Sequence, residues 1–315
     1  MDSHEFSKHI QLHSTVVLLG FTAILGALIT LGAADLVWYR MLFGFGGLWG
    51  FFVARKIPFV LPRRKVFPLL GIGVVVALHW ITFFHAINVS NVSVTLGVFA
   101  STTLFTSFLE PISQRRRIFW LEVVIGLVIL FGIYLIFQYE FHYLTGILYA
   151  LLSALLNGLF VVLNRNISLR HHPSVISFYE MIGGFVFISL FFGLTGGFSA
   201  SLFHVSAADL FYLGLLGFVC TAYAFTAIVN VMKVLSAYTV VLAINLEPVY
   251  GIVMAHFFFP EDEHMSAGFY LGTLIILVSV FAYPLVKRRV RKKNTPDSSL
   301  SAKAIRDGFR NSCLV

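Results

Sequence analysis

The stretch from Val66 to Ile87 reads VFPLLGIGVVVALHWITFFHAI and holds no Asp, Glu, Lys or Arg in 22 residues. A bilayer core about 30 Å thick takes about 20 apolar residues of helix, so this stretch predicts a membrane-spanning helix. The run is continuous and does not alternate between apolar and polar residues, which favours a helix over a barrel strand.

Nine further runs of similar length lie on either side of it, joined by short connectors that predict antiparallel neighbours. With the first stretch, the ten runs are Leu12–Leu31, Ala34–Val53, Val66–Ile87, Ser93–Leu109, Phe119–Phe137, Tyr143–Leu163, Val175–Leu194, Leu210–Val229, Ala237–Phe257 and Ala267–Leu285. Close glycine pairs, including Gly46 with Gly50 and Gly268 with Gly272, mark places where helix backbones are expected to touch. The sequence therefore predicts an all-α integral membrane protein with ten transmembrane helices.

The composition supports this class and excludes others. Of the 315 residues, 58% are hydrophobic and only 11% are charged, whereas a soluble domain has about 25% charged residues. A nucleic-acid binder and a disordered protein are excluded as the main interpretation. Two cysteines, Cys220 and Cys313, supply no disulfide framework and no set of metal ligands, so no cofactor and no metal site are predicted.

The basic residues indicate the topology. Of 22 lysines and arginines, 21 lie in the termini or in alternate connectors. They are Lys8, Arg55, Lys56, Arg63, Arg64, Lys65, Arg115, Arg116, Arg117, Arg165, Arg170, Lys233 and nine residues from Lys287 onward. By the positive-inside rule both termini are cytoplasmic, in a plasma membrane or a bacterial inner membrane. The remaining one, Arg40, lies inside the second span.

Two stretches indicate an internal repeat. Residues 38–45 (WYRMLFGF) align with residues 178–185 (FYEMIGGF) with four identities in eight, at a shift of about 140 residues. Five spans in each half is an odd number, so the second half must cross the membrane upside down. The connectors agree, because the basic loop 55–65 corresponds to 195–208, which has no lysine or arginine. Inverted repeats are typical of secondary transporters.

These features resemble the drug/metabolite transporter superfamily, and most closely its EamA-type permeases. The resemblance rests on the 5+5 inverted repeat, on Arg40, on Asn245-Leu246-Glu247-Pro248-Val249-Tyr250 in the ninth span, and on Glu261 thirteen residues after Pro248. It implies export of amino acids, other small metabolites or drugs. The first half departs from the family pattern, with Thr102-Thr103 where a proline is common and Arg116 in place of the acidic residue.

Polar residues inside the spans are the candidate site residues, because a charge at the bilayer centre costs roughly 2.5–3.5 kcal/mol on insertion scales. Substrate-binding or coupling candidates are Glu247, Asn245, His79, Trp80 and Tyr223, and Pro248 is the predicted helix kink. Arg40 and Glu180 occupy equivalent repeat positions and are candidate gate or anchoring charges. Packing alone is the alternative for each, with Arg40 reaching the interface and Glu247 bonded to a neighbouring helix.

The chain is predicted to comprise a cytoplasmic N-terminus (1–11), two five-helix repeats (12–137 and 143–285) and a basic, disordered cytoplasmic tail (286–315). The favoured function is a secondary-type exporter of small polar metabolites such as amino acids, with protons or another ion as candidate coupling ions. The partners are then a small-molecule substrate and the bilayer, with no nucleic acid. Phosphate-loop, zinc and serine-nucleophile motifs are absent, which argues against an enzyme. An intramembrane enzyme acting on a lipid-linked substrate, or a channel, is the alternative.

Overall fold

The computed structural model describes residues 3–113, 115, 120–168, 172–224, 227, 231, 243, 244 and 246–294, and the described elements are helices. They are α1 (Ser3–Leu28), α2 (Ala33–Arg55), α3 (Arg63–Val89), α4 (Val92–Phe99), α5 (Thr102–Ser113), α6 (Trp120–Tyr139), the 3-10 turn η1 (Phe141–Tyr143), α7 (Leu144–Ser168), α8 (Pro173–Thr195), α9 (Ala200–Phe203), α10 (Ala207–Gly214), the π-helix η2 (Leu215–Tyr223), α13 (Glu247–Phe258) and α14 (Ala267–Asn294).

The membrane character of these helices follows from their length and composition. Within the described residues, six stretches are long and apolar enough to cross a membrane, and three shorter apolar helices fall on the fifth, eighth and tenth predicted runs. Large apolar side chains such as Leu130, Leu190 and Val278 are more than half exposed, as expected for surfaces that face lipid. The all-helical membrane fold is therefore confirmed, while the ten-span count stays a prediction.

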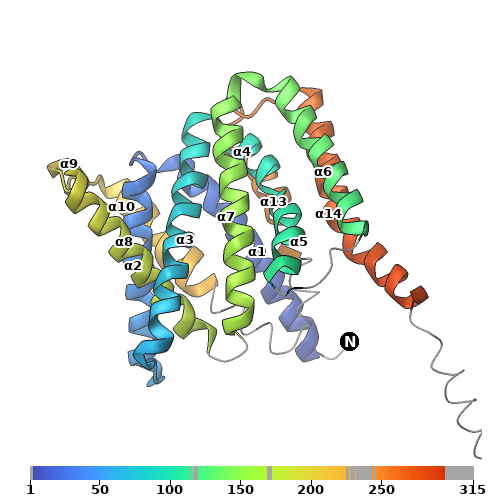
Figure 1. Cartoon of the computed structure of the whole chain (residues 1–315). Helices are drawn as coiled ribbons and strands as arrows, with labels where there is room; N and C mark the ends of the chain where they lie inside the picture. Colours follow the sequence, from blue (N-terminus) through green and yellow to red (C-terminus); the bar gives the residue numbers. More distant parts are fainter. Residues whose placement is uncertain are drawn as a thin grey trace, which may run out of the picture.

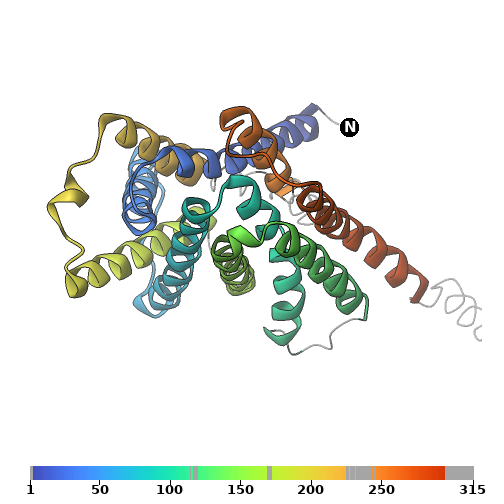
Figure 2. The same ribbon diagram turned by 90° about the horizontal axis from the view of Figure 1, so that it is seen from above.

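The helices form a bundle with two distinct ends (Figure 1). The start of α1 and the end of α14 lie at one end, here called the lower end, together with the link between α2 and α3. The links α1–α2, α3–α4, α6–α7 and α13–α14 lie at the opposite, upper end. Seen from above, α2 and α8 lie on one side of the bundle, and the packed pair α6 and α14 lies on the other (Figure 2).

The fourth predicted span is not a continuous helix, and in the ninth a described helix begins at Glu247. The fourth is divided into α4 and α5 at Ala100 and Ser101, although no proline is present there. In the ninth, Pro248 lies in the first turn of α13, with Leu246 as the N-cap. A proline is tolerated in the first turn because its missing N–H would have no helical acceptor there. The structure therefore places Pro248 at the start of α13. Residues 232–242 and 245 lie outside the described residues, so the kink at Pro248 stays a prediction.

Glycines allow three pairs of helices to approach closely. Gly73 of α3 lies against the backbone of Glu180 and Gly184 in α8, and Gly132 of α6 lies against Gly272 of α14. Gly20 of α1 meets the backbone of α13 in the same way. The helix contact predicted at Gly272 is thus present. The prediction of a contact at Gly46 and Gly50 is wrong, because a Cβ at either position would meet nothing within 4 Å.

Candidate functional site

The site is organised around Arg40, which α2 carries into the interior. Its side chain is 3% exposed, and its Nε donates a hydrogen bond of 3.0 Å to Oγ1 of Thr221. The guanidinium carbon lies 3.7 Å from the ring centroid of Trp80 on α3, in cation–π geometry. Phe84, one turn further along α3, lies 5.6 Å from the same carbon. The packing alternative supposes that Arg40 reaches the membrane interface. The structure instead buries its side chain between α2, α3 and η2.

The π-helix η2 positions the partner of Arg40. Thr221 donates its own hydroxyl proton to the carbonyl of Leu216, five residues earlier, at 2.8 Å. Its oxygen is therefore oriented to accept from the arginine. A π-helical turn is rare and often lies at a functional site. Gly217 in the same turn lies against Phe43 and the backbone of Arg40, so η2 and α2 are in close contact.

One donor of Arg40 has no partner in the part of the chain that the structure describes. Its Nη1 is buried and makes no hydrogen bond to a described residue, and none of the described carboxylates forms an ion pair with it. Glu247 on α13 and Cys220 on η2 are near enough to interact electrostatically with the guanidinium. A buried donor without an acceptor costs about 1–3 kcal/mol, and more when it is charged. The Nη1 group can therefore donate to an acceptor that a ligand brings.

His79 lies on α3, next to Trp80, but faces α7. Its Nδ1 lies 2.9 Å from Oγ and 3.1 Å from the carbonyl oxygen of Ser153, and its ring stacks on Phe99 at a centroid distance of 5.5 Å. The hydroxyl of Ser153 in turn donates to the carbonyl of His79 at 3.1 Å. These contacts tie α3 to α7 and α4, so His79 borders the Arg40 site with its ring nitrogen already engaged.

The other predicted residues lie apart from Arg40. Glu180 on α8 is 0% exposed and has Asn164 of α7 beside its carboxyl group. Tyr223 is 53% exposed and does not join the buried cluster. Asn245 lies outside the described residues. The structure therefore brings together Arg40, Trp80 and Glu247, with His79 at the edge.

Sequence reasoning missed Thr221 and Cys220. Successive residues of an α-helix are about 100° apart. Thr221 and Tyr223, two residues apart, are therefore expected on opposite faces of a regular helix, and only Tyr223 was selected as a candidate. The π-helical turn is not visible in the sequence pattern. A threonine and a cysteine in an apolar run carried no separate signal for a site.

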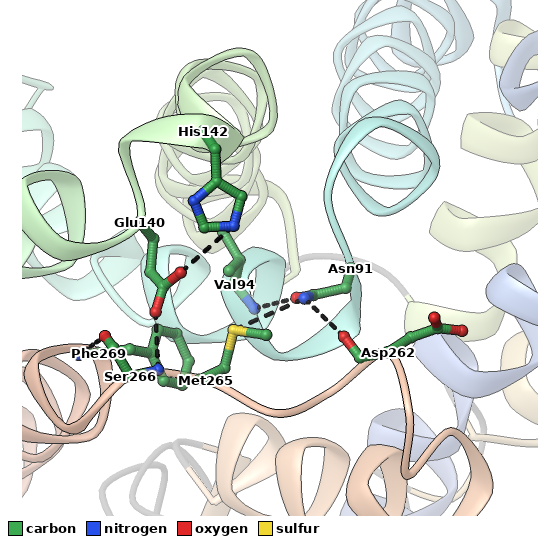
Figure 3. Close-up of polar contacts among 8 residues, drawn as sticks. All are labelled: Asn91, Val94, Glu140, His142, Asp262, Met265, Ser266 and Phe269. Carbon is green, nitrogen blue, oxygen red and sulfur yellow. Dashed lines mark hydrogen bonds and ion pairs between the residues drawn. The ribbon is translucent and has the colours of Figure 1, made fainter.

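A second set of polar contacts joins the links between helices at the upper end (Figure 3). Asn91 accepts a hydrogen bond from the backbone N–H of Val94 at 2.8 Å and donates to the carbonyl of Asp262 at 3.2 Å. The buried carboxylate of Glu263 accepts from the N–H groups of Val92 and Ser93, both at 2.8 Å. The link between α13 and α14 is thereby fastened to the N-terminus of α4.

Two more carboxylates act at this end. Glu140 accepts from the N–H of Ser266 at 2.9 Å, which joins the α6–α7 link to the start of α14 (Figure 3). Asp209 of α10 accepts from both N–H and Oγ1 of Thr30, at 2.9 and 2.8 Å, in the α1–α2 link. Burial raises the pKa of the Glu263 carboxyl, whereas its hydrogen bonds from Ser93 and Val92 favour the charged form. The predicted acidic residue Glu261 is exposed, and Glu263 makes the structural contact.

Glu263→Gln is expected to lower the free energy of unfolding by about 1–3 kcal/mol, because one of two charge-assisted hydrogen bonds to α4 is lost. The measurement is thermal or denaturant unfolding of the purified protein in detergent. Glu261→Gln, two residues away and exposed, is the matched control and should unfold like the wild type. Equal stability of the two variants would contradict the role of Glu263.

Comparisons with known proteins agree with this architecture. Residues 144–283 match the model of the EamA-like transporter family. A solved structure, described as a crystal structure of a protein, has a TM-score of 0.62 and 15% identity, covering 90% of this chain and 99% of that chain. That likeness concerns the fold alone. No curated protein matches the chain.

The family match spans α7, α8, α10, η2 and α13 and most of α14, so it includes Glu180, Thr221 and Glu247. Arg40 and Trp80 lie outside it, in the first half. The match confirms the resemblance to the EamA-type permeases, and the matched residues include the ninth-span motif. Residues 144–283 of this multi-pass membrane protein are an EamA-like transporter family domain, of the drug/metabolite transporter superfamily.

Proposed function

We propose that the protein is a secondary-type transporter of small polar metabolites such as amino acids, which works by alternating access around a site between its two halves. The observation that carries the proposal is the buried Arg40, whose Nη1 has no partner among the described residues and whose charge is near Glu247 without forming an ion pair. An amino acid has a carboxylate and an ammonium group. Its carboxylate would complete the hydrogen bonding of Arg40, and its ammonium group would face Glu247.

The depth of the residues supports a site near the middle of the membrane. Arg40 is the eighth residue of α2, so at 1.5 Å per residue it lies about 10 Å from the upper end. Trp80 lies nine residues before the end of α3, about 13 Å from the same end. Against a hydrocarbon thickness of about 30 Å, both are close to the midplane.

The helix pairs support two inverted repeats. Helices α2 and α8 have the same length, 23 residues, and a shift of 140 residues superposes their ends. Suppose that α1 corresponds to α7, α3 to α10 with η2, and α4 with α5 to α13. Two of the main helix contacts then have counterparts. Thus α1 packs on α13 as α7 packs on α4 and α5, and α3 packs on α8 as η2 packs on α2. Two similar halves of this kind can rock about a central site.

Two features support export as the direction of transport. Lysines and arginines gather at the lower end, in the α2–α3 link and beyond, which favours a cytoplasmic lower end and cytoplasmic termini. In the structure the upper end is fastened by Glu263, Glu140 and Asp209. Closure at the outer end is consistent with a state that loads its substrate from the cytoplasm, as an exporter does.

The proposal is tested by comparing the culture medium of cells that express the wild type or Glu247→Gln at matched membrane levels. An amino acid or related metabolite is expected to accumulate outside the cell with the wild type only, because the variant lacks the charge that faces the substrate ammonium group. The control is Glu261→Gln, which should export like the wild type. Identical media from all three strains would reject the exporter proposal.

A further inference from the structure

Glu180 is a buried acid that the Arg40 site does not use. It is the eighth residue of α8, which begins at the lower end, so it lies about 10 Å from that end. Arg40 lies at a similar depth from the opposite end. The Glu180 side chain is 0% exposed, and neither carboxylate oxygen has a hydrogen-bond partner among the described residues. The side chain of Asn164 is the polar group beside it.

Among the described residues, the helices packed on α8 place no positive charge beside this carboxyl group. Helix α3 presents Gly73 and Leu70, whose backbones touch Glu180 and Gly183, and α2 packs along the same helix. Titratable side chains on α2, α3 and α8 are bonded elsewhere, with Arg40 on Thr221, Tyr39 on the carbonyl of Leu202, His79 on Ser153 and Tyr179 on the N–H of Leu61. His85 packs on Tyr149, Asp35 lies in the first turn of α2, and Arg55, Arg63, Arg64 and Lys65 are exposed at the lower end.

An ionised carboxylate in these surroundings would be unstable. Removing such a group from water costs several kcal/mol unless a counter-charge and hydrogen bonds replace the solvent. A divalent metal ion would need about six oxygen ligands, and the described residues contain no group of three or more His, Cys, Asp or Glu side chains. A proton needs only one carboxylate oxygen, and therefore fits the contacts that Glu180 has.

We propose that Glu180 is a proton-binding site, separate from the Arg40 site, that is loaded in the closed arrangement and releases its proton when water reaches it from the lower end. On release, the neutral carboxyl group of Glu180 becomes a carboxylate, and its proton enters the water at the lower end. Intramembrane carboxyl groups commonly mark proton pathways in transporters. The coupling of this proton to substrate movement rests on the proposed function, whereas the binding of the proton does not.

Proton binding is tested on the purified full-length protein in lipid vesicles by infrared spectroscopy of the carbonyl stretch of protonated carboxyl groups. At neutral pH the wild type is expected to have an intensity in this band that Glu180→Gln lacks and that the exposed control Glu261→Gln retains. Raising the pH should remove that intensity. An identical band in the wild type and in Glu180→Gln would overturn the proposal.

Asn164→Ala provides a second variant in case Glu180→Gln does not fold. Because the amide lies beside the carboxyl group, its removal should shift the pH at which the Glu180 intensity disappears. An unchanged pH dependence in a folded Asn164→Ala protein would also count against the proposal.

Coupling is tested in the same vesicles with a radiolabelled amino-acid mixture and an imposed pH gradient. The wild type should accumulate label in response to the gradient, and Glu180→Gln should lose that response. The same response in Glu180→Gln as in the wild type would overturn the coupling. Wild-type vesicles that move no amino acid would reject the proposed function, while the infrared band would still decide whether Glu180 binds a proton.

Discussion

Replacing Arg40 by methionine is expected to abolish transport while leaving the protein as stable as the wild type. Glu247 is near enough for its charge to interact with that of Arg40 without an ion pair, and the Nη1 of Arg40 has no acceptor among the described residues. Removing one partner of a buried charge interaction costs about 2–5 kcal/mol of binding. This corresponds to a loss of substrate affinity of roughly 30-fold to several thousand-fold.

The stability readout separates a binding role from a structural one. Methionine has a similar length, can lie on the Trp80 ring and removes the buried Nη1 donor that has no acceptor among the described residues. Glu247, which loses the neighbouring positive charge, can take up a proton and become neutral, so the folded state should not be weakened. If Arg40 serves only to hold α2 against η2 through Thr221, the same change would lower the midpoint of thermal unfolding. A stable and fully active Arg40→Met protein would reject the substrate role.

Two further variants sharpen the experiment. Arg40→Lys keeps the charge but loses the planar group that lies over Trp80 and donates through Nε, so it should recover only part of the transport. Arg63→Met is the matched control, because Arg63 is exposed at the lower end and its loss should change neither transport nor stability. Transport is measured as efflux from cells or vesicles at matched protein levels, with unfolding followed on the same preparations.

Much of the fold could be predicted because it depends on local composition. Only helices and closed barrels satisfy every backbone group in a bilayer. A run such as Val66–Ile87, which does not alternate between apolar and polar residues, is therefore expected to be a helix. The position of Arg40 was informative for the same reason, because a charge inside such a run must have a special environment. The same reasoning selected Glu247 and Glu180.

The contacts between helices could not be predicted, because they depend on rotation and depth and not on composition. The π-helical turn brings Thr221 to Arg40 and leaves Tyr223 outside the cluster, which no regular periodicity indicates. Within the acidic link, spacing from Pro248 pointed to Glu261, but the loop geometry brings Glu263 to α4. Among the glycines that the sequence favoured, Gly46 and Gly50 meet nothing within 4 Å, whereas Gly272 has a backbone contact.

Gly73→Ala is expected to be the most damaging single methyl addition in α3. A Cβ at this position would overlap the carbonyl oxygen of Glu180 and come within 2.9 Å of the backbone nitrogen of Gly184. These are backbone atoms of α8 that no side-chain rotation can move, so α3 and α8 would have to separate. Overpacking typically lowers the free energy of unfolding by 1–3 kcal/mol, and for this clash with backbone atoms we expect a loss of about 3 kcal/mol or more.

Gly71→Ala is the control, since it makes the same change two residues earlier in the same helix, where a Cβ would meet nothing within 4 Å. Alanine favours a helix by about 1 kcal/mol over glycine, so this variant should unfold at the same temperature as the wild type or slightly higher. The measurement is the midpoint of thermal unfolding in detergent, together with the amount of protein in the membrane. Because Glu180 lies on the helix that Gly73→Ala displaces, the variant should also hydrate that carboxyl group and weaken its protonated-carboxyl infrared band. Similar unfolding of the two variants would show that α3 and α8 do not meet at Gly73, and would remove the packing that isolates Glu180 from water.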